Sequence, residues 1–241
     1  WFAAADIDLR IGFDLSLTNL AALELVTGMS LLGQVYALGY LDKEWALARF
    51  YALVGFFEGA LAGVVLSSSL FMSYFLLEML TLSTYLLVGF WYAQPLVVTA
   101  ARDAFLTKRV GDVLLLMGMV ALSAWAGSME FGDLYAWAAD ADASGALTPL
   151  AGTLLGLGLI AGPMGKCAQF PMHLWLDEAM EGPNPASILR NSVVVTAGAL
   201  VLIKVMPLLR FSPLATTVLL VVGTISAVAG ALVAIAQVDI K

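Results

Sequence analysis

The chain has few of the side chains on which soluble enzymes rely for catalysis and metal binding. Cys167 is its only cysteine and His173 its only histidine, which excludes a disulfide framework and a zinc site built from these two residue types alone. Charged residues make up 12% of the sequence, whereas soluble domains average roughly 25%. The formal net charge is −7 and no basic patch with interleaved aromatic residues occurs, so nucleic acid is not expected as a partner.

What the chain has in excess is apolar length. Hydrophobic residues make up 61% of its 241 residues, more than the interior of a soluble domain of this size can hold. The apolar runs are continuous rather than alternating, which favours membrane-spanning helices of about 20 residues over a β-barrel. We therefore predict an all-α, polytopic transmembrane helix bundle that forms one membrane domain over residues 1–241. About seven spans are expected, at 17–41, 48–68, 70–92, 103–126, 148–170, 186–208 and 214–238.

One of these spans is predicted to be broken by proline. The segment 148–170 runs into Pro171, and proline removes a backbone hydrogen bond and kinks or ends a helix, which places the break near residues 166–172. A short continuation over 172–181 is expected beyond it. The chain begins at Trp1, without an initiating methionine or a signal peptide, so we expect a fragment of a longer subunit.

Charge is distributed unevenly between the connecting segments. The loop expected at 127–147 carries several acidic residues and neither lysine nor arginine, and the N-terminal stretch is also mostly acidic. Positive residues gather at 42–49 and around residues 102–109. The positive-inside rule predicts that 42–47, 93–102 and the C-terminal end lie in the cytoplasm, and that 127–147 faces the opposite compartment.

Ionisable residues inside the predicted spans are the main functional signal. Each costs at least ~2.5–3.5 kcal/mol at mid-bilayer, and such residues usually line an ion or proton pathway. Glu78 and Lys166 are the strongest candidates for proton transfer. Burial lowers the pKa of a lysine and a nearby carboxylate raises it again, so a lysine whose partner comes and goes is a proton switch. The alternative is a fixed pair that only holds two helices together.

Several other intramembrane charges are open to both interpretations. Glu58 and Glu24 are carboxylates within spans, and each suits proton conduction or helix packing equally well. Lys108, Arg109 and Asp112 fall within about one helical turn, where Arg109 and Asp112 have the spacing of a locally neutralised pair. We treat these three residues as supporting or gating candidates.

Three further residues follow the predicted break. His173 comes directly after it, and because histidine titrates near neutral pH it suits the exit of a proton wire, although a structural role is equally open. Arg190 and Asn191 lie early in the next span. An arginine cannot usefully release its proton, so Arg190 is expected to gate or tune a pathway or to bind an anion rather than to relay protons.

Sequence motifs resemble the antiporter-like subunits of respiratory and photosynthetic complex I. The run from Gly165 to Ser187 (GKCAQFPMHLWLDEAMEGPNPAS) is similar to their signature, most closely to that of the largest of them, the F (chain 5) subunit. The stretches 85–92, 104–112 and 237–241 are similar to it as well. The resemblance implies that Glu78 matches the glutamate of the family's Lys/Glu ion pair and that Lys166 matches its central lysine on the broken helix. Arg109 and Asp112 then match its arginine and aspartate, with Lys108 in place of an asparagine.

One departure from the family pattern points to a specialised form. Where the family carries a channel histidine this chain has Asn191, preceded by Arg190, and Glu58 replaces an uncharged position. This combination resembles the F subunit of the cyanobacterial complex that takes up CO2. The resemblance implies a thylakoid NDH complex that passes electrons from ferredoxin to plastoquinone, with a hydrophilic CO2-hydrating subunit on its cytoplasmic side.

The expected partners of such a subunit are the other membrane subunits of the NDH complex, the CO2-hydrating subunit and lipid. Plastoquinone and iron–sulfur clusters are expected in other subunits, and no redox centre, cofactor site or metal site is expected in this chain. Two alternatives remain open: a subunit of an ordinary respiratory complex I or of a sodium/proton antiporter, and a structural docking subunit that transfers no protons.

Overall fold

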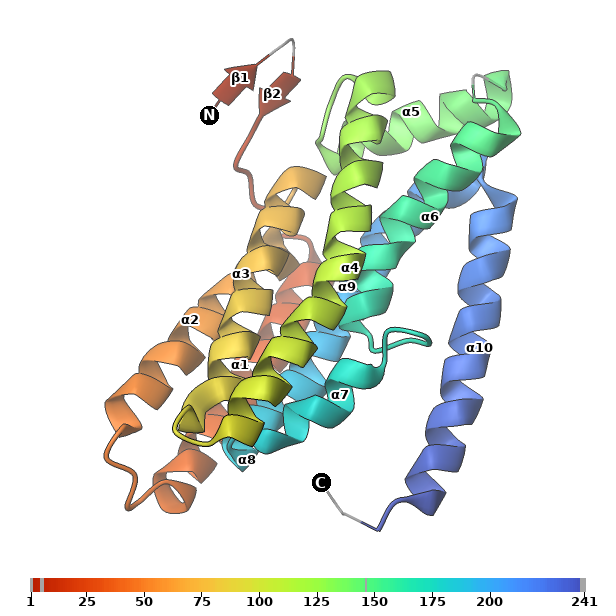
Figure 1. Ribbon diagram of the computed structural model, residues 1–241. Helices are drawn as coiled ribbons and strands as arrows, with labels where there is room; N and C mark the ends of the chain where they lie inside the picture. Colours follow the sequence, from red (N-terminus) through yellow and green to blue (C-terminus); the bar gives the residue numbers. More distant parts are fainter. Residues whose placement is uncertain (1, 5–6, 146, 239–241) are drawn as a thin grey trace.

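The computed structural model describes residues 2–4, 7–145 and 147–238, and Figure 1 shows them as a bundle of helices. The predicted all-α bundle is confirmed. The only sheet among the described residues is a short antiparallel hairpin ahead of the first helix, formed by β1 (Phe2–Ala4) and β2 (Ile7–Leu9).

The first three helices form an up-and-down layer close to the predicted bounds. They are α1 (Leu17–Tyr40), α2 (Leu47–Leu66) and α3 (Leu70–Val88), the last continued by the 3₁₀ turn η1 (Gly89–Trp91). The turn between α2 and α3 is tight because Ser69 caps α3, its hydroxyl accepting a hydrogen bond from the amide of Met72 at 3.2 Å.

Helix α4 (Pro95–Ala126) begins earlier than the predicted span at 103–126. Most of the segment 93–102, predicted as a loop, is therefore helical. The proline at the first helical position favours this start, since its missing amide hydrogen is not needed there. Gly127, with a φ of 66°, ends the helix in the left-handed conformation that glycine adopts most readily.

The prediction of a loop at 127–147 was wrong, because this segment contains helix α5 (Phe131–Ser144). Figure 1 shows α5 lying across the end of the bundle. Leu134, Ala138 and Ala141 are buried at helical spacing, so the segment is amphipathic and packs on the bundle through one face. The many acidic residues of this segment made its helical spacing of apolar residues hard to recognise in the sequence.

Helix α6 (Pro149–Lys166) runs beside α4 at close range. A Cβ atom on Gly118 of α4 would lie 3.0 Å from the carbonyl carbon of Gly158 on α6, and one on Gly111 would lie 2.7 Å from the carbonyl oxygen of Ala161. The two backbones touch because small residues face each other, an arrangement common between membrane helices. This contact positions the residues near the C-terminal end of α6.

The predicted helix break near residues 166–172 is confirmed, although the helix ends before Pro171. Helix α6 ends at Lys166, and the chain is non-helical until α7 (Leu174–Glu178), which the 3₁₀ turn η2 (Ala179–Glu181) continues. Ala168 has a φ of 52°, a left-handed conformation that ends the helix before Pro171 is reached. The connecting loop lies at mid-height of the bundle (Figure 1), where its Phe170 amide donates to Ser226 Oγ of helix α10 (Pro213–Ala236) at 2.8 Å.

The predicted span at 186–208 is helical but irregular. It consists of α8 (Asn184–Ser187), the π-helical turn η3 (Ile188–Val194), α9 (Val195–Val205) and the 3₁₀ turn η4 (Met206–Phe211). A π-turn inside a helix often marks a functional position. Here it contains both Arg190 and Asn191.

Four of the described helices are long and apolar enough to cross a membrane, judged by length and composition. They are Leu17–Tyr40, Leu47–Leu66, Leu70–Trp91 and Pro213–Ala236. The apolar window of α10 is wholly unburied within this chain, as expected for a helix surrounded by lipid or by neighbouring protein. The count of seven spans stays a prediction.

Different connections form the two ends of the bundle, and the predicted difference in charge between these ends stays a prediction. The α1–α2 connection, the start of α4 and the C-terminal end of α10 lie at one end, and the hairpin and α5 lie at the other (Figure 1). We call the first the positive end, because it carries Lys43, Arg49 and Arg102.

Candidate functional site: a buried lysine cluster at the helix break

The centre of the bundle holds a buried ion pair between α6 and α4. The ammonium nitrogen of Lys166 lies 2.7 Å from Asp112 Oδ1 and donates to Oδ2 at 2.8 Å. Lys166 is 1% exposed and Asp112 is 1% exposed. The same ammonium donates to the hydroxyl of Thr81 on α3, and this hydroxyl lies 3.3 Å from Asp112 Oδ2. We call Lys166, Asp112 and Thr81 the Lys166 cluster.

The position of Lys166 follows from the helix break and from the close approach of α4 and α6. Lys166 is the last residue of α6, so beyond it the chain leaves the helix. Gly198 of α9 packs against this end, where a Cβ atom would lie 2.9 Å from Lys166 Cβ. The indole nitrogen of Trp175 on α7 donates to the carbonyl of Gly165 at 2.7 Å and so satisfies an acceptor freed by the break.

A second buried lysine lies beside this cluster. The ammonium of Lys108 on α4 donates to Thr84 Oγ1 at 2.7 Å and lies 4.2 Å from the centre of the Trp175 ring. Thr84 in turn donates to the carbonyl of Thr81 at 2.8 Å. The indole of Trp175 therefore contacts Lys108 through its face and the end of α6 through its nitrogen, which links the two lysines through one side chain.

The predicted pairing of the charged residues was wrong in both of its pairs. Lys166 pairs with Asp112 rather than with Glu78, and Arg109 pairs with Glu78 rather than with Asp112. Arg109 Nη1 donates to Glu78 Oε2, and their side chains are 38% and 20% exposed. Asp112 lies on the face of α4 that packs against α6, whereas Arg109 reaches α3, so contacts between helices override the local i,i+3 spacing.

Glu58 on α2 belongs to a separate polar cluster with α1. Its Oε2 accepts hydrogen bonds from Ser30 Oγ at 2.6 Å and from Gln34 Nε2 at 3.1 Å. Tyr51 donates to the backbone carbonyl of Gln34 at 2.9 Å. We call Glu58, Ser30 and Gln34 the Glu58 cluster. Both partners of this carboxylate are neutral, whereas Asp112 and Glu78 each have a cation among their partners.

The other predicted residues lie outside these two clusters. His173 is exposed, stacks on Phe170 with ring centres 5.7 Å apart, and within the described part of the chain makes no hydrogen bond to the Lys166 cluster. Asn191 has a buried Oδ1 that finds no donor among the described residues. The side chain of Arg190 lies outside the described residues. Glu24 is exposed on α1.

Lys204 on α9 caps the C-terminal end of α2. Its ammonium donates to the carbonyls of Val64 at 3.2 Å, Val65 at 2.8 Å and Ser67 at 2.8 Å. The carbonyl of Lys204 itself accepts from the hydroxyl of Tyr135 on α5 at 2.7 Å, and burial raises the pKa of this tyrosine above its ordinary value. Lys204 therefore connects three helices at the end opposite the positive end.

Sequence reasoning missed the uncharged members of these sites. Thr81 and Thr84 are three residues apart on α3, and Ser30 and Gln34 are four apart on α1, so each pair shares one face of its helix. Polar residues at helical spacing inside an apolar span were the signal that could have revealed them. Trp175 gave no such signal, because indole rings also occur on lipid-facing surfaces.

The arrangement has the chemistry of a proton switch. In general, burial disfavours the charged form of a lysine and a nearby carboxylate favours it, so a buried pair that opens and closes can take up and release a proton. The break next to Lys166 provides backbone that can rearrange, since such broken helices occur in membranes where they line a cavity or are covered by protein.

Comparison with known proteins agrees with the motifs. The family described as NADH:quinone oxidoreductase/Mrp antiporter, transmembrane, matches residues 67–241, and the one described as NADH-ubiquinone oxidoreductase (complex I), chain 5 N-terminus, matches residues 1–51. The chain therefore belongs to the family of antiporter-like complex I membrane subunits.

Relatives with this architecture are NAD(P)H-quinone oxidoreductase subunits. Subunit 5, organellar chromatophore 2, of Paulinella chromatophora is 77% identical over 237 residues, which cover 98% of this chain and 38% of that protein. The chloroplastic subunits 5 of Lolium perenne and Triticum aestivum are 37% identical across all of this chain and 33% of their own lengths. The chain thus spans little more than a third of the relatives that it matches.

Proposed function

We propose that this chain is the proton-transferring part of an F-type membrane subunit of an NDH complex, in the form that couples electron transfer from ferredoxin to plastoquinone with the hydration of CO2. The observation that carries the proposal is the Lys166–Asp112 pair at 2.7 Å, buried at a helix break. Buried charges at mid-membrane are costly, and a pair that opens and closes is a means of moving protons.

The coupling to CO2 uptake is supported by two positions. Asn191 stands where the family has a channel histidine, and an asparagine side chain cannot relay a proton by gaining charge. Glu58 adds a carboxylate that the family lacks. Hydration of CO2 releases a proton with bicarbonate, so a carboxylate open to the cytoplasm would draw the reaction forward by removing that proton.

The proposed setting is a cyanobacterial thylakoid membrane, with a hydrophilic CO2-hydrating subunit bound on the cytoplasmic side. The other NDH membrane subunits would hold the remaining helices of the pathway. Plastoquinone and the iron–sulfur clusters would reside elsewhere in the complex, which leaves to this chain the movement of protons and not the redox chemistry.

The test is light-dependent CO2 uptake and proton transfer in cells that carry Lys166→Met or Glu58→Gln, together with a native gel that shows the assembled complex. We expect both variants to assemble and to lose most of their uptake. Normal uptake in an assembled Lys166→Met complex would favour a docking subunit, and sodium-dependent proton transfer in vesicles would favour an antiporter. If Glu58→Gln keeps normal uptake while Lys166→Met loses it, Glu58 does not remove the proton that CO2 hydration releases.

A further inference from the structure

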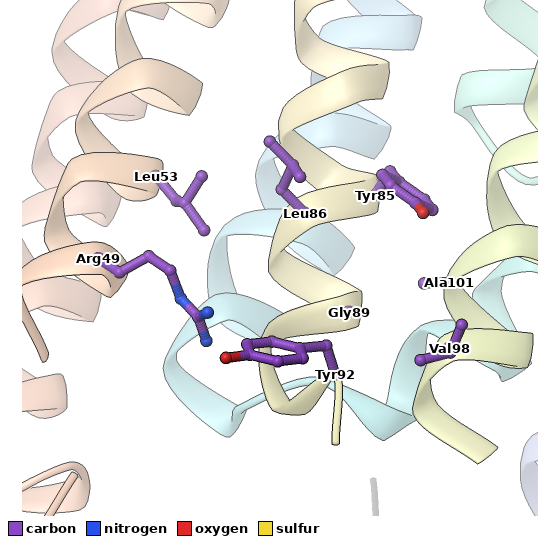
Figure 2. Close-up of a pocket in the computed structure, with 8 residues that line it drawn as sticks. All are labelled: Arg49, Leu53, Tyr85, Leu86, Gly89, Tyr92, Val98 and Ala101. Atoms are coloured by element: carbon purple, nitrogen blue, oxygen red, sulfur yellow. The ribbon is translucent and has the colours of Figure 1, made fainter. Parts of the chain in front are cut away.

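A groove opens at the positive end between α2, α3 and α4. It has a volume of about 290 Å³ and is drawn in Figure 2, which shows Arg49 from α2 reaching toward Tyr92 across its lower part. Leu53, Leu86 and Tyr85 line it further along the helices, whereas Val98 lies at the level of Tyr92 on the α4 side. The groove is thus basic and aromatic at one end, and further along it is lined by Leu53 and Leu86 with Tyr85 beside them.

Arg49 is a cation without a carboxylate partner among the described residues. Its Nη2 donates to the carbonyl of Phe90 at 2.5 Å, and its guanidinium carbon lies 4.6 Å from the Phe90 ring centre and 4.9 Å from that of Tyr92. Its Nε is buried and finds no acceptor in the described part of the chain. The nearby carboxylate of Glu44 accepts instead from the indole nitrogen of Trp91 at 3.0 Å.

Aromatic residues place this end of the groove at the membrane surface. Trp45 is 83% exposed on the α1–α2 connection and Tyr92 is 57% exposed after η1. Exposed tryptophan and tyrosine side chains concentrate at the level of lipid headgroups. The aliphatic part of the groove then extends toward the hydrocarbon region, because Leu53 and Leu86 lie further from the helix ends than Arg49 and Tyr92 (Figure 2).

We propose that this groove binds one anionic glycerolipid, with its phosphate or sulfonate at Arg49 and part of an acyl chain along Leu53 and Leu86. A guanidinium that is held against two rings and has no carboxylate partner among the described residues suits an anionic oxygen in charge and in hydrogen-bonding capacity. The exposed side chain of Leu86 and the half-buried side chain of Leu53 suit a hydrocarbon chain. A lipid supplies the anion and the apolar tail together, as the two halves of the groove require.

The binding test uses the whole purified complex in nanodiscs of phosphatidylcholine. A trace of phosphatidylglycerol with a photoreactive acyl chain is added, and labelled peptides from α2, α3 and α4 are identified by mass spectrometry. We expect labelling along the groove, and Arg49→Gln should reduce it about fivefold, the effect of one basic residue at an anionic membrane surface. Val98→Trp, which fills the groove from its lipid side, should also reduce it.

Arg102→Gln is the matched control. Arg102 lies at the same end of the bundle on α4, but it is exposed and pairs with Asp103 at 2.8 Å, so its loss should leave labelling unchanged. The proposal fails if Arg49→Gln labels as the unchanged chain does, or if photoreactive phosphatidylcholine labels equally. It also fails if excess inorganic phosphate displaces the label, or if labelling appears only after a neighbouring subunit is removed.

Discussion

Breaking the Lys166–Asp112 pair from each side separates its structural role from its role in proton transfer. Lys166→Met leaves Asp112 buried without its cation, and Asp112→Asn leaves the Lys166 ammonium without its carboxylate. Removal of one partner from a buried pair costs about 3–5 kcal/mol. That is a large share of the about 5–15 kcal/mol that stabilises a typical domain, so each single variant should lower the heat stability of the complex.

The double variant Lys166→Met/Asp112→Asn should recover much of this loss. No charge is then left uncompensated, and the amide of the new asparagine can hydrogen-bond to Thr81, which lies 3.3 Å from the present carboxylate. The assay is the thermal transition of the solubilised complex, measured for the unchanged chain, both single variants and the double variant. Proton transfer in vesicles, followed by a pH-sensitive dye, should be absent in all three variants.

An exposed pair on the same helix provides the control. Arg102 and Asp103 are 62% and 41% exposed, and such surface pairs are worth between about 0 and 1 kcal/mol. The corresponding Arg102→Gln/Asp103→Asn cycle should therefore show almost no coupling and normal proton transfer. The reasoning is refuted if the double variant of the buried pair is as unstable as the two single losses added together, or if it transfers protons normally.

Three further substitutions test the packing around the site, each by the thermal transition of the assembled complex. Gly118→Val should cost about 1–3 kcal/mol, because a Cβ atom would already lie 3.0 Å from the Gly158 backbone, whereas Gly132→Ala, with no atom within 4 Å, should be tolerated. Trp175→Phe should cost about 0.5–1.5 kcal/mol, the net value of one hydrogen bond, because the Gly165 carbonyl keeps its bond from the amide of Ala168 at 3.4 Å. Unchanged stability would contradict the role given to the indole nitrogen. Lys204→Met should loosen the end of α2 and destabilise the complex more than Lys43→Met, which alters an exposed lysine.

The helices were largely predictable from sequence because hydropathy reports the environment of long segments. Helices α1, α2, α3 and α10 begin and end within a few residues of the expected spans. The errors occur where a local signal misled. The acidic residues of α5 suggested a loop although its apolar residues have helical spacing. Pro171 correctly indicated the region of the helix break, but the predicted span ran to residue 170, whereas α6 ends at Lys166, ahead of the left-handed Ala168.

The charged residues of the candidate site could be selected from sequence, but their partners could not. Charge inside an apolar span singled out Lys166, Asp112 and Glu58, because burial of charge is costly whatever the fold. Which carboxylate meets which cation depends on the rotation of α3, α4 and α6 about their axes, and hydropathy does not report rotation. The close contact between Gly118 and Gly158 brings the Asp112 face of α4 against α6.

The hydrogen-bond and ion-pair partners of each carboxylate affect how readily it can exchange a proton. Protonation of Glu78 would neutralise one side of its pair with Arg109, and protonation of Asp112 would do the same to Lys166. Among the described residues, Glu58 accepts hydrogen bonds only from a hydroxyl and an amide, at 2.6 and 3.1 Å. A hydroxyl can turn from donor to acceptor, so Ser30 can follow a proton onto this carboxylate and off it. Under the proposed function, Glu58 is therefore better suited than Glu78 to take up and release a proton, because no cation loses its partner when it does so.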